Sequence, residues 1–140
     1  MGVKTYDPKQ MSIVIGGKQA SGFADGTFLN VELDEDAFGL TVGADGEGMR
    51  AKSNNKSATI TLTLLPTSDY NRHLSELAQA DEDSNAGAVP LLIKDGSGFD
   101  IHAAETVWIQ KKAPAEYSRE GSPREWVLRT DSLQSFLGGN

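Results

Sequence analysis

The side chains that could carry out acid–base or nucleophilic chemistry are few and lie far apart in the sequence. The 140 residues include two histidines, His73 and His102, and no cysteine. A catalytic histidine needs a nucleophile and an orienting carboxylate beside it, and no spacing in this chain suggests such a group. The lack of cysteine excludes disulfides and thiolate metal sites. We therefore interpret both histidines as surface or half-buried side chains.

Acidic residues beside glycine turns are the next place to look for a site. Asp95 and Asp100 flank a glycine turn, but the alternating oxygen ligands and the final bidentate glutamate of a calcium loop are missing. The glycine-rich run at 43–48 has Asp45 and Glu47 where a phosphate-binding loop would hold its anion. The sequence predicts no catalytic residue, no metal site and no cofactor, and it does not favour an enzyme.

Aromatic side chains leave one binding alternative open. Trp108, Tyr117 and Trp126 could contact a small ligand, and a tryptophan can stack on a sugar or a base. Core packing is the commoner fate of a tryptophan in a strand. A monomeric β-sandwich that binds a small ligand through these three side chains therefore remains as an alternative.

Composition and charge set limits on the class of protein. With 38% hydrophobic and 24% charged residues, we expect one soluble globular domain, 1–140. No apolar run approaches the roughly 20 residues that span a bilayer, and the first residues lack the apolar core of a secretory signal. We expect no membrane anchor, and the chain is compatible with synthesis in the cytoplasm.

The net charge of −7 bears on nucleic-acid binding. Tight binding to a phosphate backbone requires a dense basic patch, and the nearest approach to one is Arg50, Lys52 and Lys56. Two interpretations of the acidic excess stay open. It can serve solubility alone, or it can form a surface that DNA passes without sticking.

The stretch from Lys52 to Asp83 must position the rest of the chain, because it combines a polar turn, a long alternating strand and a helix. Strand alternation puts two sets of residues on opposite faces: Ala58, Ile60, Leu62 and Leu64 on one, and Thr59, Thr61 and Thr63 on the other. Pro66 ends this strand, and residues 67–69 suit a helix N-cap. One apolar stripe follows at helical spacing: Tyr70, His73, Leu74, Leu77 and Ala78.

Further strands are predicted on both sides of this unit. They cover 11–15, a short return to position 23, 28–34, 89–94, 99–112 and 125–130, with an irregular lead-in at 6–9 and a short tail segment at 132–137. In 28–34, alternation places Leu29, Val31 and Leu33 inward and Asn30, Glu32 and Asp34 outward. The fold class is therefore mainly β with one α-helix, as a β-sandwich or a small barrel.

The long connection at 38–57 is predicted to be a protruding hairpin. Phe38, Leu40 and Val42 alternate, and an Asp-Gly pair supplies the turn. The segment is acidic before position 48 and basic after it, which suits a surface that docks on another copy of the same protein. A solvated, flexible hairpin is the alternative.

Several segments in order resemble one known family. They are VKTYDPKQ (3–10), SGFADGTF (21–28), EDAF (35–38), VGADG (42–46), RAKSNN (50–55), WVL (126–128) and RTDSL (129–133). Together they resemble the tail tube proteins of contractile-tailed bacteriophages. The resemblance implies a virion structural protein that assembles as hexameric rings, stacked into the hollow inner tube that conducts DNA during ejection. The implied partners are the sheath, baseplate and tail-terminator proteins, with passing double-stranded DNA that is not specifically bound.

The resemblance also implies roles for two groups of residues. The inter-ring stacking loop would comprise Phe38, Leu40, Val42, Asp45, Glu47, Arg50, Lys52, Asn54, Asn55 and Lys56. The candidate lumen-facing residues, which would form a polar and acidic wall, are Asn30, Glu32, Asp34, Thr59, Thr61 and Thr63. The N-terminal segment and the C-terminal tail would also bridge subunits. The outer solvent surface is the alternative location for the second group, and the inner tube of a non-viral contractile injection system is the alternative for the whole chain.

Overall fold

The structure is a computed structural model, and it describes residues 2–139. Its elements are, in chain order, a 3₁₀ turn at Pro8–Gln10, β1 (Met11–Ile15), β2 (Lys18–Gln19), β3 (Leu29–Leu33), β4 (Phe38–Val42), β5 (Gly48–Lys52), β6 (Ala58–Leu64), α1 (Tyr70–Ser84), β7 (Val89–Asp95), β8 (Asp100–Lys111), β9 (Arg124–Thr130) and β10 (Leu133–Phe136). The chain is mainly β with one α-helix, which confirms that part of the predicted fold class.

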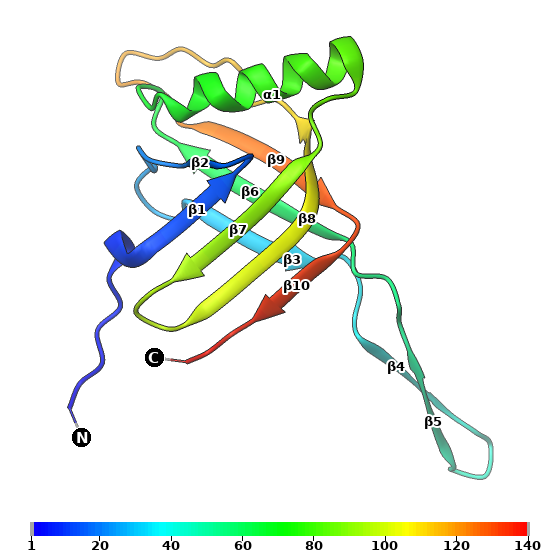
Figure 1. Cartoon of the computed structure of the whole chain (residues 1–140). Coiled ribbons are helices and arrows are strands. Elements are labelled where there is room, and N and C mark those ends of the chain that lie inside the picture. Colours follow the sequence, from blue (N-terminus) through cyan, green and yellow to red (C-terminus); the bar gives the residue numbers. More distant parts are fainter. Residues whose placement is uncertain (1, 140) are drawn as a thin grey trace.

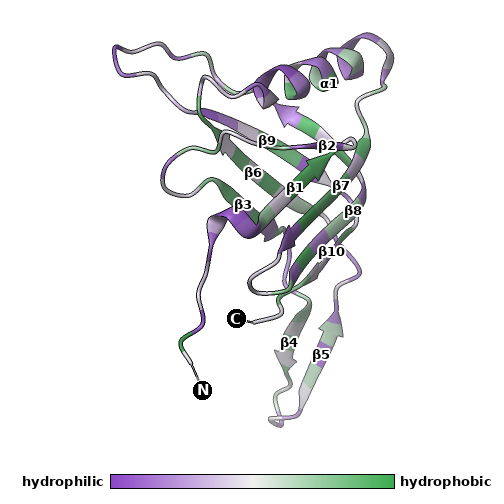
Figure 2. Cartoon of the chain, turned by 60° about the vertical axis from the view of Figure 1, so that its left-hand side comes forward, coloured by the Kyte–Doolittle hydropathy of each residue, from purple (hydrophilic) through white to green (hydrophobic). Residues whose placement is uncertain are grey.

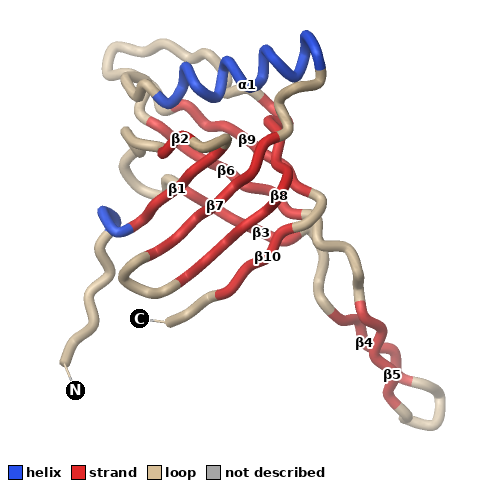
Figure 3. Tube along the Cα trace, in the orientation of Figure 1, coloured by secondary structure: helices blue, strands red, loops and turns tan. Residues whose placement is uncertain are grey.

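Eight strands form one antiparallel sheet in the order β2-β1-β7-β8-β9-β6-β3, and β10 also pairs with β8. The sheet curls so that β1, β7 and β8 cross β3, β6 and β9, while α1 lies across one end (Figures 1 and 3). The two layers expected of a sandwich are therefore two halves of one continuous sheet, rolled like a small open barrel. In the described chain, β4 and β5 form a separate two-stranded sheet that projects from this body.

The core lies inside the curl. The alternation of β6 is confirmed, because Ala58, Ile60, Leu62 and Leu64 are all buried while the threonines between them are partly exposed. The two halves of the sheet share one apolar cluster, to which β1 and β7 contribute Ile13, Ile15, Leu91 and Ile93. Burying these side chains in a continuous cluster stabilises the curled sheet.

Helix α1 closes one end of the core, as its apolar stripe predicts. Tyr70, Leu74 and Ala78 are buried on its inner side. The Tyr70 hydroxyl donates to the Lys18 carbonyl at 2.7 Å and accepts from the Ile15 amide at 3.2 Å. These hydrogen bonds fasten the first turn of the helix to the β1–β2 hairpin.

The ends of the helix follow ordinary capping chemistry. The N-cap residue, Asp69, makes no capping hydrogen bond with its side chain; the hydroxyl of Ser68, one residue earlier, accepts from the amide of Tyr70 at 3.2 Å instead. The helix ends at Ser84, and the next residue, Asn85, has a φ of 57°, the left-handed conformation common after a last helical turn. It therefore continues through Asp81–Ser84, beyond the point at which the three acidic residues break the apolar stripe.

Three local expectations are wrong in detail. Leu33 is 45% exposed rather than inward, because it ends an edge strand where the chain leaves the body for the projecting hairpin. The lead-in is not wholly irregular, because Pro8–Gln10 forms a 3₁₀ turn. The Asp7 carboxylate caps this turn by accepting a hydrogen bond from the Lys9 amide at 3.0 Å. The return strand after the Gly16–Gly17 turn has only two residues.

The C-terminal segment is a strand, which its composition did not indicate. Thr130 lies opposite Val107 and Leu133 opposite Ala104, so β9 and β10 continue along the same edge of β8 in one register. Beyond β10, the Gly138 amide donates to the Asp100 carboxylate at 2.8 Å. A side chain at position 138 would collide with the Gly98 carbonyl, so glycine allows the tail to pass close to the β7–β8 turn.

Candidate assembly surfaces

The β4–β5 hairpin is a free-standing arm. Every residue of both strands is exposed, and Figure 2 shows the arm extending away from the body. The register pairs Phe38 with Lys52 and Leu40 with Arg50, so apolar and basic side chains share one face. The Arg50 guanidinium lies over the Phe38 ring at 4.4 Å from its centroid. The opposite face carries Met49 and smaller residues.

The turn and the base of the arm are ordered by local hydrogen bonds. At the tip, the Gly43 amide donates to the Glu47 carbonyl at 2.8 Å, and Gly46 takes a φ of 89° that suits glycine. At the base, the Ser53 hydroxyl donates to the Glu35 carboxylate at 2.9 Å. An isolated two-stranded hairpin is marginally stable in water, so these local hydrogen bonds are the contacts that order the arm within this chain.

The predicted stacking-loop residues fall into three places. Five lie on the apolar and basic face of the ladder or along its strands: Phe38, Leu40, Val42, Arg50 and Lys52. Asp45 and Glu47 lie in the turn, where the Asp45 carboxylate accepts from the Glu47 amide at 3.2 Å. The remaining three, Asn54, Asn55 and Lys56, belong to the connection with the body.

The six predicted lumen residues come together on the outer side of β3 and β6. The register places Asn30 opposite Thr61 and Glu32 opposite Thr59. The Asp34 carboxylate, one residue past β3, accepts from the Thr59 hydroxyl at 3.0 Å. The same face continues onto β9, because Arg129 lies opposite Thr59. We call this surface the threonine face.

An ion pair crosses the threonine face. Arg129 Nη2 lies 2.5 Å from Asp34 Oδ2, and Arg129 Nη1 donates to Gln110 Oε1 at 3.1 Å. Hydrogen bonding from the Ser57 hydroxyl, followed by Thr59 and Arg129, holds the pKa of Asp34 below its ordinary value against the opposing effect of desolvation. Asp34 is therefore charged but locally compensated, and Glu32 and Glu125 carry the uncompensated acidity of this face.

The histidines have structural partners. His73 Nε2 lies 2.7 Å from the Ile15 carbonyl, and His102 Nδ1 lies 2.7 Å from the Ser135 hydroxyl. Partial burial lowers the pKa of His102, although the nearby Asp100 opposes this shift. Asp100 accepts from the Gly138 amide, so these groups tie the C-terminal segment to β8 rather than forming a triad. Within residues 2–139, His, Asp and Glu are not clustered as metal ligands.

The ligand-binding alternative loses one of its three aromatic residues. Trp126 is buried in the core, and its Nε1 donates to the Asn71 side chain at 2.9 Å, so it cannot stack on a ligand. Trp108 is half-buried in β8, opposite Arg129. Tyr117 is exposed, with the Arg124 guanidinium 5.1 Å from its ring centroid. The structure does not bring the three together.

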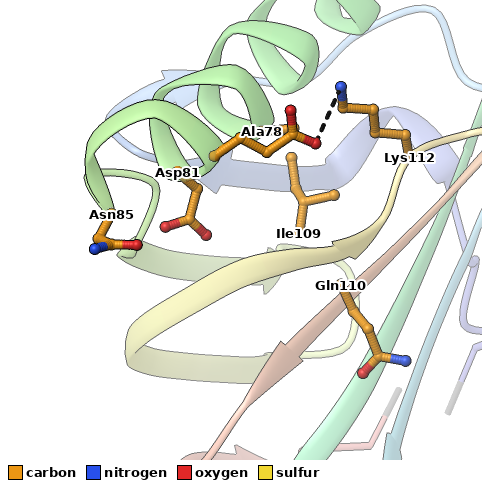
Figure 4. A pocket seen from close by; sticks show the side chains of 7 residues that line it. Ala78, Asp81, Asn85, Ile109, Gln110 and Lys112 are labelled. Atoms are coloured by element: carbon orange, nitrogen blue, oxygen red, sulfur yellow. Dashed lines mark ion pairs between the residues drawn. The ribbon is translucent and has the colours of Figure 1, made fainter.

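A shallow pocket between the C-terminal end of α1 and β8 also lacks reactive chemistry (Figure 4). Lys112 Nζ lies 3.5 Å from the Glu82 carboxylate across its mouth. The Asp81 carboxylate accepts from the Gly87 amide at 3.3 Å, which ties down the loop after the helix. These contacts hold the helix end against the sheet.

No helix in residues 2–139 is long and apolar enough to cross a membrane.

Comparison with known proteins decides the family. The family model of the bacteriophage PhiTE tail tube protein matches residues 11–138. The chain belongs to this tail tube family. A relative with 30% identity over 144 residues is "Structural protein ORF10" of Pseudomonas phage KPP10, and the match covers 97% of the tail tube chain and 83% of the relative.

Two solved structures share the fold at 12% identity. One is the anti-feeding prophage cap, described as a tube terminating cap, with a TM-score of 0.65 over 98% of the tail tube chain and 95% of the cap chain. The other is the sheath/tube terminator of an extracellular contractile injection system, PVC, in the extended state, with a TM-score of 0.66 over 96% and 98% of the two chains. The predicted resemblance to tail tube proteins is confirmed. The chain is a non-enzymatic structural protein of a phage tail.

Proposed function

We propose that the chain is the repeating subunit of the inner tail tube. In this proposal a single domain assembles into hexameric rings, and the rings stack into a hollow cylinder that conducts phage DNA during ejection. The observation that carries the proposal is the β4–β5 arm, whose strands are exposed along their whole length and whose apolar face is not covered by the body. A subunit that docks such an arm on the next ring can extend a tube.

Lateral contacts would close each ring. In the described chain β3 pairs with β6 alone, so its second edge carries unpaired backbone groups. Exposed strand edges invite pairing with another chain, and a closed ring of sheets satisfies them. Lateral contacts that close and axial contacts that do not close together give a cylinder of stacked rings.

The threonine face is our candidate for the wall of the lumen. Its hydroxyls and carboxylates would present a polar surface to passing DNA. Glu32 and Glu125 would repel the phosphate backbone only near the wall, because screening limits the repulsion to about 8 Å at physiological salt. Low adhesion requires the absence of a basic stripe, and the single arginine here is paired with Asp34.

A tube terminator is the second candidate, and the two structural neighbours favour it by their described roles. A terminator binds the last ring and then stops growth, so it needs one axial contact surface. A repeating subunit needs two axial contact surfaces.

The proposed tube would contact the sheath along its outside, the baseplate at one end and a terminator at the other.

Electron microscopy of the concentrated, purified protein tests the proposal. We expect long hollow tubes with a constant diameter and a six-fold end view. Single rings that do not stack at any concentration would favour the terminator. A protein that stays monomeric with baseplate present to nucleate growth would overturn both. Cryo-imaging of intact tails checks the same point, because a tube subunit must wall the whole length of the channel.

A further inference from the structure

A second surface has the chemistry to receive the arm. The outer side of β1, β7, β8 and β10 exposes apolar side chains where a solvated sheet would carry polar ones. Leu92 is 37% exposed, Ile101 44% and Phe136 66%. The registers place Leu92 opposite Ala103 and Ile101 opposite Phe136, so these residues are adjacent. We call this surface the receiving face.

The receiving face is flanked by opposite charges. Lys94 lies opposite Ile101 at one end. At the other end, Glu105 borders a depression with Pro90, Ala103 and Gln134. Glu105 is four steps along β8 from Ile101, which is about 13 Å at the rise of an antiparallel strand.

The arm has the same length and the reverse order of charge. Its apolar row runs over the five residues from Phe38 to Val42, which is four steps along the strand and again about 13 Å. Glu47 lies beyond Val42 at the tip, and Lys52 lies opposite Phe38 at the base. If the tip of the arm lies at the Lys94 end, Glu47 meets Lys94 and Lys52 meets Glu105. The apolar row of the arm then lies over the apolar residues of the receiving face. The opposite direction would place like charges together.

We propose that the β4–β5 arm of one copy lies along the receiving face of a second copy, with Glu47 at Lys94 and Lys52 at Glu105. This inference rests on the proposed tube function, to which it adds the identity and direction of the axial contact. The arm extends away from its own body (Figures 1 and 2), so in this proposal the occupant is the arm of another copy. A chain that has both surfaces can continue a stack at each end.

The cysteine-free sequence permits a direct crosslinking test. Leu40→Cys and Leu92→Cys are made as separate variants, mixed, concentrated and oxidised, and the joined peptides are identified by mass spectrometry. We expect a 40–92 disulfide. The matched control mixes Leu40→Cys with Thr61→Cys, which lies on the outer side of the other half of the curled sheet, and we expect no 40–61 disulfide.

The natural protein is imaged under the same conditions, because replacing Leu40 itself weakens the proposed contact; its assembly and the crosslink together separate the two proposals. Tubes with the 40–92 disulfide support both. Tubes without it overturn the docking inference and leave the tube function standing. The disulfide without tubes or stacked rings supports the docking contact and counts against the tube function. Neither product would overturn both.

Charge exchange tests the direction of the arm. Glu47→Lys and Lys94→Glu should each lower the sedimenting fraction of tubes roughly tenfold, because a rim attraction becomes a repulsion. The double variant should recover to within roughly threefold of the natural protein. Both side chains are exposed, so folding is not at risk. A double variant no better than the singles would overturn the proposed direction.

Discussion

The curled body and the β4–β5 arm show two ways in which one chain can be ordered. In the body, β6 buries alternate side chains in a continuous core, and the Ile15 amide of β1 donates a hydrogen bond to the Tyr70 hydroxyl of α1. In the arm, an identical alternation of apolar residues faces solvent. The strand pattern is the same in both places, and the difference is whether a second layer covers it. Stability therefore resides in the body, whereas the arm is available for contacts between copies.

The largest expected effect on stability is in the core of the body. Leu62→Ala should lower the free energy of unfolding by about 2–5 kcal/mol, because the fully buried side chain leaves a cavity. Urea denaturation followed by circular dichroism measures it. The control, Thr61→Ala on the outer side of the same strand, should change the free energy by no more than about 1 kcal/mol. Equal losses in both variants would contradict the assignment of the two faces.

A smaller effect is expected where the helix meets β1. Tyr70→Phe removes a buried hydroxyl that donates to Lys18, so it should cost about 1–2 kcal/mol. Burial also raises the pKa of Tyr70 to about 12. Because the raised pKa favours the neutral folded form, its contribution is complete below the ordinary tyrosine pKa of about 10 and is lost as the pH rises through about 12. Unfolding at pH 8 and at alkaline pH should show a larger alkaline loss in the natural protein than in Tyr70→Phe.

The Asp34–Arg129 ion pair should contribute less, because it is partly exposed to solvent. The pKa of Asp34 is lowered, so its contribution is present above the ordinary aspartate pKa of about 3.9 and is lost as the pH falls below that value. We expect Asp34→Asn to lower the melting temperature at neutral pH and to remove part of the decline in acid. Thermal melts across that range test this, and parallel acid curves for the two proteins would refute it.

The smallest effect on stability should accompany the largest effect on assembly. Leu40→Ser in the arm removes an exposed side chain, so the free energy of unfolding should stay within about 0.5 kcal/mol. The same variant should form few or no tubes under the electron microscope. Thr41→Ser, on the other face of the arm, is the matched control and should assemble normally. If Leu40→Ser failed to fold, the arm would contribute to the stability of the chain, which would contradict the division of stability and assembly between body and arm.

The parts of the fold that depend on local periodicity could be predicted from the sequence. The alternation of 58–64 and the apolar stripe from Tyr70 to Ala78 each identify their own buried side, and the structure confirms both. The inward placement of Leu33 failed because an edge strand can leave the core before its alternation ends. The alternation of apolar and polar residues along a strand does not indicate where the opposite layer of the core ends.

The surfaces were harder to predict, because they depend on pairing between distant segments. Asp34 and Arg129 are 95 positions apart, and no local pattern joins them. The receiving face was missed because Leu92, Ile101 and Phe136 occupy the outward phase of three strands, and β10 itself was not expected. In 89–94, apolar residues occupy both the inward and the outward positions of the strand, and this pattern was a sequence signal of an apolar outer face.

Strand β10 connects the two contact surfaces within each copy. The Leu133 amide donates to the Lys56 carbonyl at 2.9 Å, close to the root of the arm, while Phe136 at the other end belongs to the receiving face. If the arm docks as proposed, each arm is linked to the receiving face of its own copy through this four-residue strand, and the buried Leu133 anchors that link in the core.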